Sequence, residues 1–510
     1  MAQYGKALAG RHQLITGRAP NELLRRLANN EEVLLEVHDL LTDAVKENHR
    51  IIPAGEWLLD NFYLIQEQIR TGKKHLPKGY SEDLPQLSNG PSAGLPRVYD
   101  IALEIISHSD GRVDQQGLSH FIAAYQTVTH LKLGELWAIP IMLRLALIEN
   151  LRRLAAQISV DRINQNLAAY WAGEMTAISE KDPKSLILVI ADMARSEPPM
   201  VSSFVAELTR MLQGKGPALA LPLTWIEQRL SETGQTSNEL VQAEFQKQAA
   251  DQVSMSNSIG SLRFLGTTDW REFVESTSIV EQTLREDIDG IYAGMDFTTR
   301  DHYRHVVEKI ARYSSTSEEE VARLAIQLAK TNEKGRMAHV GYYLVGKGRG
   351  QIEKAAKMKL PYADLLEKAV RRYPLTFYIS VITLITLFIA GGFFVRTQDN
   401  GIRNGLLVLV AILSILSASQ LAVTLVNWIV TLLVSPRLLP RMDFSKGIPH
   451  ECRTLVVVPT LFSSEGELEE LLEDLEVRFL ANRNEQLHFA LLTDFADGCY
   501  KLPFSPSPEC

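Results

Sequence analysis

Two long apolar runs without a charged residue constrain this chain most strongly. Residues 375–395 and 406–434 contain no Asp, Glu, Lys or Arg. About 20 apolar residues, rising about 1.5 Å each in a helix, cross a hydrocarbon core of about 30 Å. A buried helix of a soluble domain seldom stays uncharged over such a length. We therefore predict a pair of transmembrane helices within residues 374–434. Within them, Gln420 and Asn427 could each hydrogen-bond to a neighbouring helix or lie near a membrane interface.

Charges beside the two runs predict their orientation. The basic residues of the outer flanks are Lys354, Lys357, Lys359, Lys368, Arg371 and Arg372 before the first run, and Arg437, Arg441 and Lys446 after the second. The short connection contains only Arg396 and Arg403, with Asp399 beside them. Because Lys and Arg accumulate on the cytoplasmic side, both ends of the chain are expected in the cytoplasm. The lipid bilayer is thus the first predicted partner.

The region before the membrane, residues 1–373, is predicted to be a large, helical, cytoplasmic domain. Apolar residues recur there at helical spacing, as in Val33, Val37 and Leu41, and alternating strand patterns are scarce. The chain has a net charge of −8, which argues against a nucleic-acid partner. Its three cysteines have no metal-site spacing.

Two motifs in this region have both a functional and a structural interpretation. His302, His305 and Glu308 lie at helical spacing and could form part of a metal site, but they also fit a solvated helix face with Arg–carboxylate pairs. The glycine-rich residues 345–350 resemble a phosphate-binding loop, although they lack the complete spacing of a known motif. We favour the helix face and a flexible basic turn, and predict neither a metal site nor a catalytic residue.

The stretch 451–498 reads as strand, acidic amphipathic helix and strand. The run Leu455 to Val458 is typical of a strand buried on both faces. Ligands bind beyond the carboxyl ends of parallel strands, which makes Thr460, Asp494 and Asp497 the candidate ligand-binding residues. Either aspartate could accept hydrogen bonds from a nucleobase or a ribose, and the alternative of a turn-forming aspartate remains open. Residues 499–510 are predicted to be a coil tail.

Specific phrases point to a family. The strand–helix–strand pattern is similar to the start of the nucleotide-sugar-binding fold of inverting, processive glycosyltransferases. Longer phrases are WLLDNFYLIQEQI, LPKGYSEDLPQL, GIYAGMDFTTRDHYRHVVEKIAR, MDFSKGIP and ECRTLVVVPTLFSSEGELEELLEDLEVRFLANRN. Through them the chain, from about Leu23 to Asp497, resembles the N-terminal part of the bacterial cyclic β-1,2-glucan synthases. The fold class expected is therefore mainly α: a helical region, two transmembrane helices, and the first β-α-β unit of an α/β glycosyltransferase fold.

The resemblance implies an inner-membrane enzyme that transfers glucose from UDP-glucose to β-1,2-glucan, with Mg²⁺ or Mn²⁺ as cofactor. The family continues through an Asp-x-Asp metal motif and a Gln-x-x-Arg-Trp segment, which do not occur in the stretch after Asp497. We therefore expect a truncated, inactive form with weak or no UDP-glucose binding. The alternative is a non-enzymatic, membrane-anchored helical scaffold that associates with a full-length synthase.

Overall fold

The computed structural model describes residues 2–15, 22–76, 84–331, 335–359, 369–370, 372–399, 405–433, 439–462 and 465–495. These residues are mainly α-helical, as predicted, with a single pair of strands between them. The chain divides into two compact units, Met1–Thr283 and Leu284–Cys510, so the division falls inside the region predicted as one helical domain.

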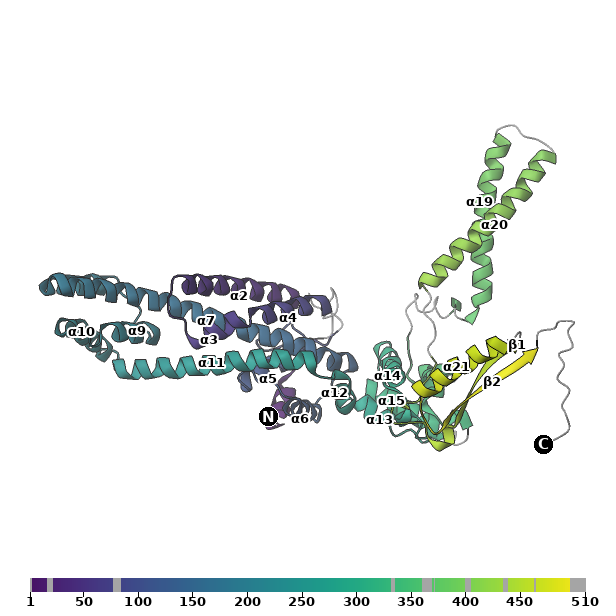
Figure 1. Cartoon of the computed structure of the whole chain (residues 1–510), viewed down its shortest axis with the longest axis horizontal. Helices are drawn as coiled ribbons and strands as arrows, with labels where there is room; N and C mark the ends of the chain where they lie inside the picture. The colour runs from purple at the N-terminus through teal and green to yellow at the C-terminus, as the bar shows by residue number, and fades with distance from the viewer. Residues whose placement is uncertain are drawn as a thin grey trace. The chain divides into compact units, whose positions relative to one another are not determined.

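The first unit is built from helices, several of which are visible in Figure 1. They are α1 (Ala2–Arg11), α2 (Leu23–Lys46), α3 (Pro53–Asp60), α4 (Phe62–His75), α5 (Arg97–His108), α6 (Gln115–Gln126), α7 (Leu133–Lys181), α8 (Leu186–Arg195), α9 (Ser202–Leu212), α10 (Ala220–Ser231), α11 (Ser237–Thr267), α12 (Trp270–Thr277) and α13 (Ile279–Leu284), with short 3-10 turns at Pro183–Ser185 and Pro217–Leu219.

The long helix α7 organises the first unit. Its N-terminal half is apolar around most of its circumference, and residues such as Leu147, Ile148 and Leu151 are fully buried. Helices α2, α4, α5 and α11 pack against it. The C-terminal half of α7 forms a second core, in which Ala172 and Met175 cluster with buried residues of α8, α9 and α10. One helix therefore connects two cores in the first unit.

The second unit contains a small helical part, an apolar hairpin and the strands. Its elements are a 3-10 turn (Tyr292–Gly294), α14 (Phe297–Arg312), α15 (Glu318–Thr331), a 3-10 turn (Gly335–Met337), α16 (Val340–Leu344), α17 (Arg349–Ala355), α19 (Pro374–Asp399), α20 (Gly405–Leu433), a 3-10 turn (His450–Cys452), β1 (Thr454–Phe462), α21 (Glu465–Ala481) and β2 (Leu487–Phe495).

Helices α19 and α20 pack side by side as the hairpin drawn in Figure 1. Both are long and apolar enough to cross a membrane, over Pro374–Thr397 and Val408–Leu432. Small side chains, among them Ala390, Ala418 and Ala422, are buried in the hairpin and let the two backbones approach closely. The Tyr378 hydroxyl donates a hydrogen bond of 2.8 Å to Asn427 Oδ1. Asn427 therefore bonds to the neighbouring helix, one of the two roles expected for it.

Candidate functional site

The candidate ligand-binding edge is formed by the carboxyl ends of β1 and β2. The two strands are parallel and aligned from Thr454 opposite Leu487 to Phe462 opposite Phe495. Helix α21 connects them and packs on both, with the rings of Phe479 and Phe489 at 6.5 Å. This is the strand–helix–strand order predicted from the sequence.

The register places Thr460 and Asp494 at the same edge but on opposite faces of the sheet. Thr460 is opposite Thr493, and Asp494 is opposite Leu461. Since side chains alternate between faces along a strand, Thr460 shares the face of Phe489, which α21 covers. Asp494 lies on the other face and is exposed, whereas Thr460 is half-buried. A ligand that contacts both residues must therefore extend beyond the strand ends. Asp497, the third predicted residue, lies outside the described residues.

The face of the sheet that carries Asp494 has no covering layer among the described residues. Leu455 is 60% exposed, Val457 41% and Leu492 63%, and all three alternate onto this face. The prediction that β1 is buried on both faces is therefore wrong for the described residues. The run of valines and leucines does form a strand, as predicted. A parallel sheet is normally covered on both faces, and the described residues supply a covering layer on one face only.

The motif around His302 forms a helix face. Asp301 pairs with Arg304 at 3.1 Å and with His305 at 3.4 Å, and Glu308 pairs with Arg312 at 3.2 Å. The searched part of the chain contains no group of three His, Cys, Asp or Glu side chains that could hold a metal ion.

Packing explains two of the three glycines in the loop 345–350. A Cβ atom on Gly346 would lie 2.8 Å from the carbonyl oxygen of Tyr342, and one on Gly348 would lie 2.6 Å from the ring of the same tyrosine. The element before the loop is helix α16, not the strand that precedes a phosphate-binding loop. Arg349 Nε donates to Glu353 at 3.1 Å. The close approach of backbone and tyrosine therefore accounts for Gly346 and Gly348 without a phosphate, whereas a Cβ atom on Gly350 would meet nothing within 4 Å.

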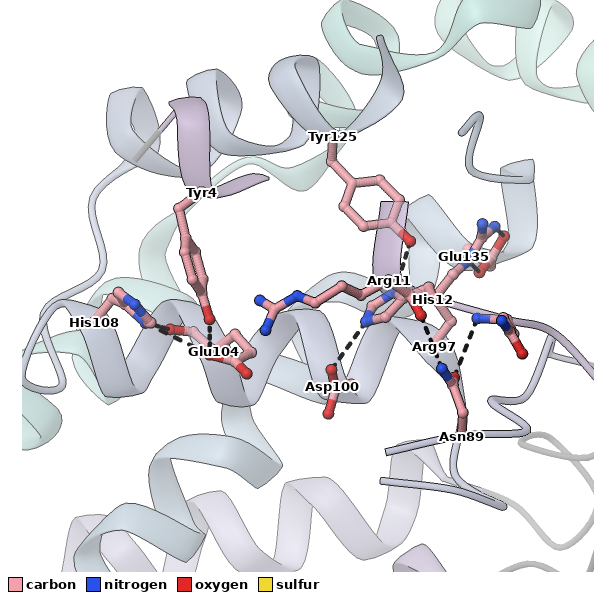
Figure 2. Close-up of polar contacts among 11 residues, drawn as sticks. Tyr4, Arg11, His12, Asn89, Arg97, Asp100, Glu104, His108, Tyr125 and Glu135 are labelled. Carbon is pink, nitrogen blue, oxygen red and sulfur yellow. Dashed lines mark hydrogen bonds and ion pairs between the residues drawn. The ribbon is translucent and has the colours of Figure 1, made fainter. Parts of the chain in front are cut away.

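The structure also brings together a polar cluster that the sequence did not reveal. His12 lies between Asp100, at 3.0 Å from Nε2, and Tyr125, at 2.8 Å from Nδ1, as Figure 2 shows. Burial acts to raise the pKa of Asp100, but hydrogen bonds from His12 and Ser92, together with electrostatic attraction to His12 and Arg11, outweigh it, so this pKa lies below its ordinary value. Burial raises the pKa of Tyr125 to about 12. The cluster holds the segment after α1 against α5 and α6.

A buried ion pair lies beside this cluster in Figure 2. Arg97 donates to both carboxylate oxygens of Glu135, at 2.9 and 2.5 Å, and both side chains are almost completely buried. Arg97 also donates to the carbonyl of His130 at 3.2 Å. Such a pair fixes the start of α7 relative to α5. Because its charges are mutually satisfied, we assign it a structural role.

The chain is 32% identical over 494 residues to the cyclic β-(1,2)-glucan synthase NdvB of Rhizobium meliloti (strain 1021). Over this length the chain is similar to a cyclic β-(1,2)-glucan synthase. The match covers 95% of this chain and 17% of that protein, so the chain spans about a sixth of the length of this synthase. The resemblance predicted from the sequence phrases is confirmed over this length. No family model matches the chain.

Proposed function

We propose that this chain belongs to a membrane glycosyltransferase of the cyclic β-1,2-glucan synthase type, which transfers glucose from UDP-glucose to β-1,2-glucan. The observation that carries the proposal is the similarity to a glucan synthase along 95% of the chain. The parallel β1–α21–β2 unit supports it, because its strand ends form the edge where such folds bind nucleotides. Here the unit is proposed as the first part of that fold.

In this proposal α19 and α20 cross the bacterial inner membrane and both ends of the chain are cytoplasmic. The charged flanks support this orientation, and it puts β1 and β2 on the side where UDP-glucose is made. A reporter that is active only in the cytoplasm should be active when it is fused after Lys446. A reporter that is active only in the periplasm should be active when it is inserted at Asn400. The opposite pattern would contradict the orientation.

The proposed contacts to UDP-glucose are a few hydrogen bonds to its nucleotide part. The exposed Asp494 carboxylate can accept a hydrogen bond from the uracil N3–H or a ribose hydroxyl, and the Thr460 hydroxyl can bond to the same nucleotide beyond the strand ends. Asp497 is proposed as a further acceptor. These residues would hold the nucleotide and not the anomeric carbon at which glucose is transferred.

Transfer itself requires more than these contacts. The diphosphate leaving group must be neutralised, usually by a divalent metal between two aspartates, and a carboxylate must take the proton of the acceptor hydroxyl. The described residues contain no group that fits such a metal, so we derive no step through Mg²⁺ or Mn²⁺. We propose that the 510-residue polypeptide alone binds UDP-glucose weakly and does not synthesise glucan.

Equilibrium dialysis of the purified, detergent-solubilised chain with labelled UDP-glucose tests the binding. Asp494→Ala should weaken binding about tenfold, which corresponds to one hydrogen bond to a charged group. Asp474→Ala is the matched control, because Asp474 is an exposed carboxylate on α21 away from the strand ends. Equal binding by both variants would exclude Asp494 as a contact.

The synthesis assay separates this function from the scaffold alternative. Chain in vesicles with labelled UDP-glucose and Mg²⁺ should incorporate no glucose into β-1,2-glucan, and incorporation would contradict the proposed inactivity. The two cores of the first unit favour the scaffold as the second candidate, because they consist of first-unit residues and include none from the sheet. Lack of UDP-glucose binding, together with specific capture of a full-length synthase, would favour the scaffold.

A further inference from the structure

A short backbone pairing ties the chain after α20 to the start of α14. Met295 and Met442 form an antiparallel bridge. The Asp296 amide donates to the carbonyl of Arg441 at 2.9 Å, and the amide of Arg441 donates to the Thr299 hydroxyl at 3.0 Å. These bonds connect residues on the two sides of the apolar hairpin within the second unit. The helical part that begins at α14 is therefore attached to the chain where it leaves α20.

Covalent geometry limits how far this attachment lies from the hairpin. Residues 434–440 separate the end of α20 at Leu433 from Arg441. The eight residue steps from Leu433 to Arg441 span at most about 29 Å when fully extended. If α20 crosses a bilayer, the start of α14 must lie within this reach of the membrane. This step rests on the proposed membrane placement of α19 and α20.

The same helical part carries exposed positive charge around α17. The lysine cluster consists of Lys347, Lys354, Lys357 and Lys359, all exposed. Ile352 and Ala356 are buried on the other side of the segment, and the Lys359 amide donates to the carbonyl of Tyr313 at 2.8 Å. The acidic residue within this segment is Glu353, which pairs with Arg349 at 3.1 Å. No ion pair to another described residue neutralises the lysine cluster.

We propose that the lysine cluster binds anionic lipid headgroups at the membrane surface. Lysine stems are long and flexible, so their ammonium groups can reach phosphate groups while the backbone stays above them. Each lysine near an anionic surface favours the bound state roughly fivefold, and the attraction fades beyond a Debye length of about 8 Å. The attachment at Arg441 tethers the helical part near the bilayer, and binding requires that the lysine cluster comes within this Debye length of the headgroups. The bound cluster would orient the helical part of the second unit on the bilayer.

Acetylation of the full chain in vesicles tests the proposal. The chain is reconstituted into vesicles of phosphatidylcholine alone or with phosphatidylglycerol, treated with an uncharged acetylating reagent, and each lysine is quantified by mass spectrometry. The lysine cluster should react several-fold more slowly in the anionic vesicles, and 0.5 M NaCl should restore its rate. Lys181, Lys184 and Lys215 are the reference, because they are exposed residues of the first unit.

A matched pair of variants sharpens the test. Lys354→Gln with Lys357→Gln should remove most of the protection from Lys347 and Lys359, whereas Lys181→Gln with Lys184→Gln should leave it unchanged. Equal rates in both kinds of vesicle would overturn the proposal, and so would equal slowing of the reference lysines. Failure of the chain to float with vesicles would overturn the membrane placement as well, whereas flotation without protection would overturn this inference alone.

Discussion

The first unit and the β1–α21–β2 unit use similar apolar residues with opposite results. In the first unit, the aliphatic side chains along the N-terminal half of α7 are buried under several helices, among them α2, α4, α5 and α11. In the sheet, Leu455 and Leu492 lie on a face that no described element covers. The difference shows that a local pattern specifies the type of element, whereas burial depends on whether the chain supplies a second layer.

Breaking the buried ion pair in the first unit should have the largest effect. Glu135→Ala leaves the Arg97 guanidinium buried without its carboxylate, so we expect the free energy of unfolding to fall by about 3–5 kcal/mol. Urea denaturation monitored by tryptophan fluorescence measures this free energy, since Trp57, Trp137 and three other tryptophans belong to this unit. Asp43→Ala, which breaks an exposed pair with Lys46, should leave the midpoint unchanged. Equal midpoints for both variants would show that the pair contributes little.

Truncating one aliphatic side chain in each region to alanine should reduce the free energy of unfolding by different amounts. Ile148→Ala creates a cavity in the core and should cost about 2–5 kcal/mol. Leu492→Ala removes a side chain that is already exposed and should change stability by less than about 0.5 kcal/mol. Pulse proteolysis in urea, with the fragments of each region identified by mass spectrometry, reports both. Similar losses in both regions would mean that the sheet face is covered in solution.

Acid should weaken the first unit through Asp100. The folded-state pKa of this carboxyl lies below its ordinary value, so its stabilising effect is complete above the ordinary value of 3.8 and is lost as the pH falls through the folded-state pKa. Asp100→Asn should therefore cost about 1 kcal/mol at neutral pH, and less as the pH falls below about 4. Urea denaturation of both proteins between pH 2 and 7 measures this. If the difference in unfolding free energy between the two proteins did not change with pH, the Asp100 carboxylate would be excluded as the source of this stability.

The sequence predicted the features that local patterns determine. The length of the two uncharged apolar runs predicted the helices α19 and α20, and the helical spacing of apolar residues predicted the helices before them. Thr460 and Asp494 were placed correctly at one edge of the sheet, but their opposite faces follow from the register, which the pattern does not specify. His12 could not be matched with Asp100 and Tyr125, because they lie 88 and 113 residues away in sequence. The division after Thr283 was also hidden, since helical periodicity continues across it.

Hydrogen exchange of the detergent-solubilised chain, read by mass spectrometry, tests the contrast between the two regions most directly. Amides of α7 around Ile148 should exchange only on global unfolding of the first unit, because they lie in a closed core. Amides of β1 and β2 should exchange orders of magnitude faster, because the strand pair has a covering layer on one face only. Equal protection of the two regions would contradict this account and show that the sheet is stable without a second layer.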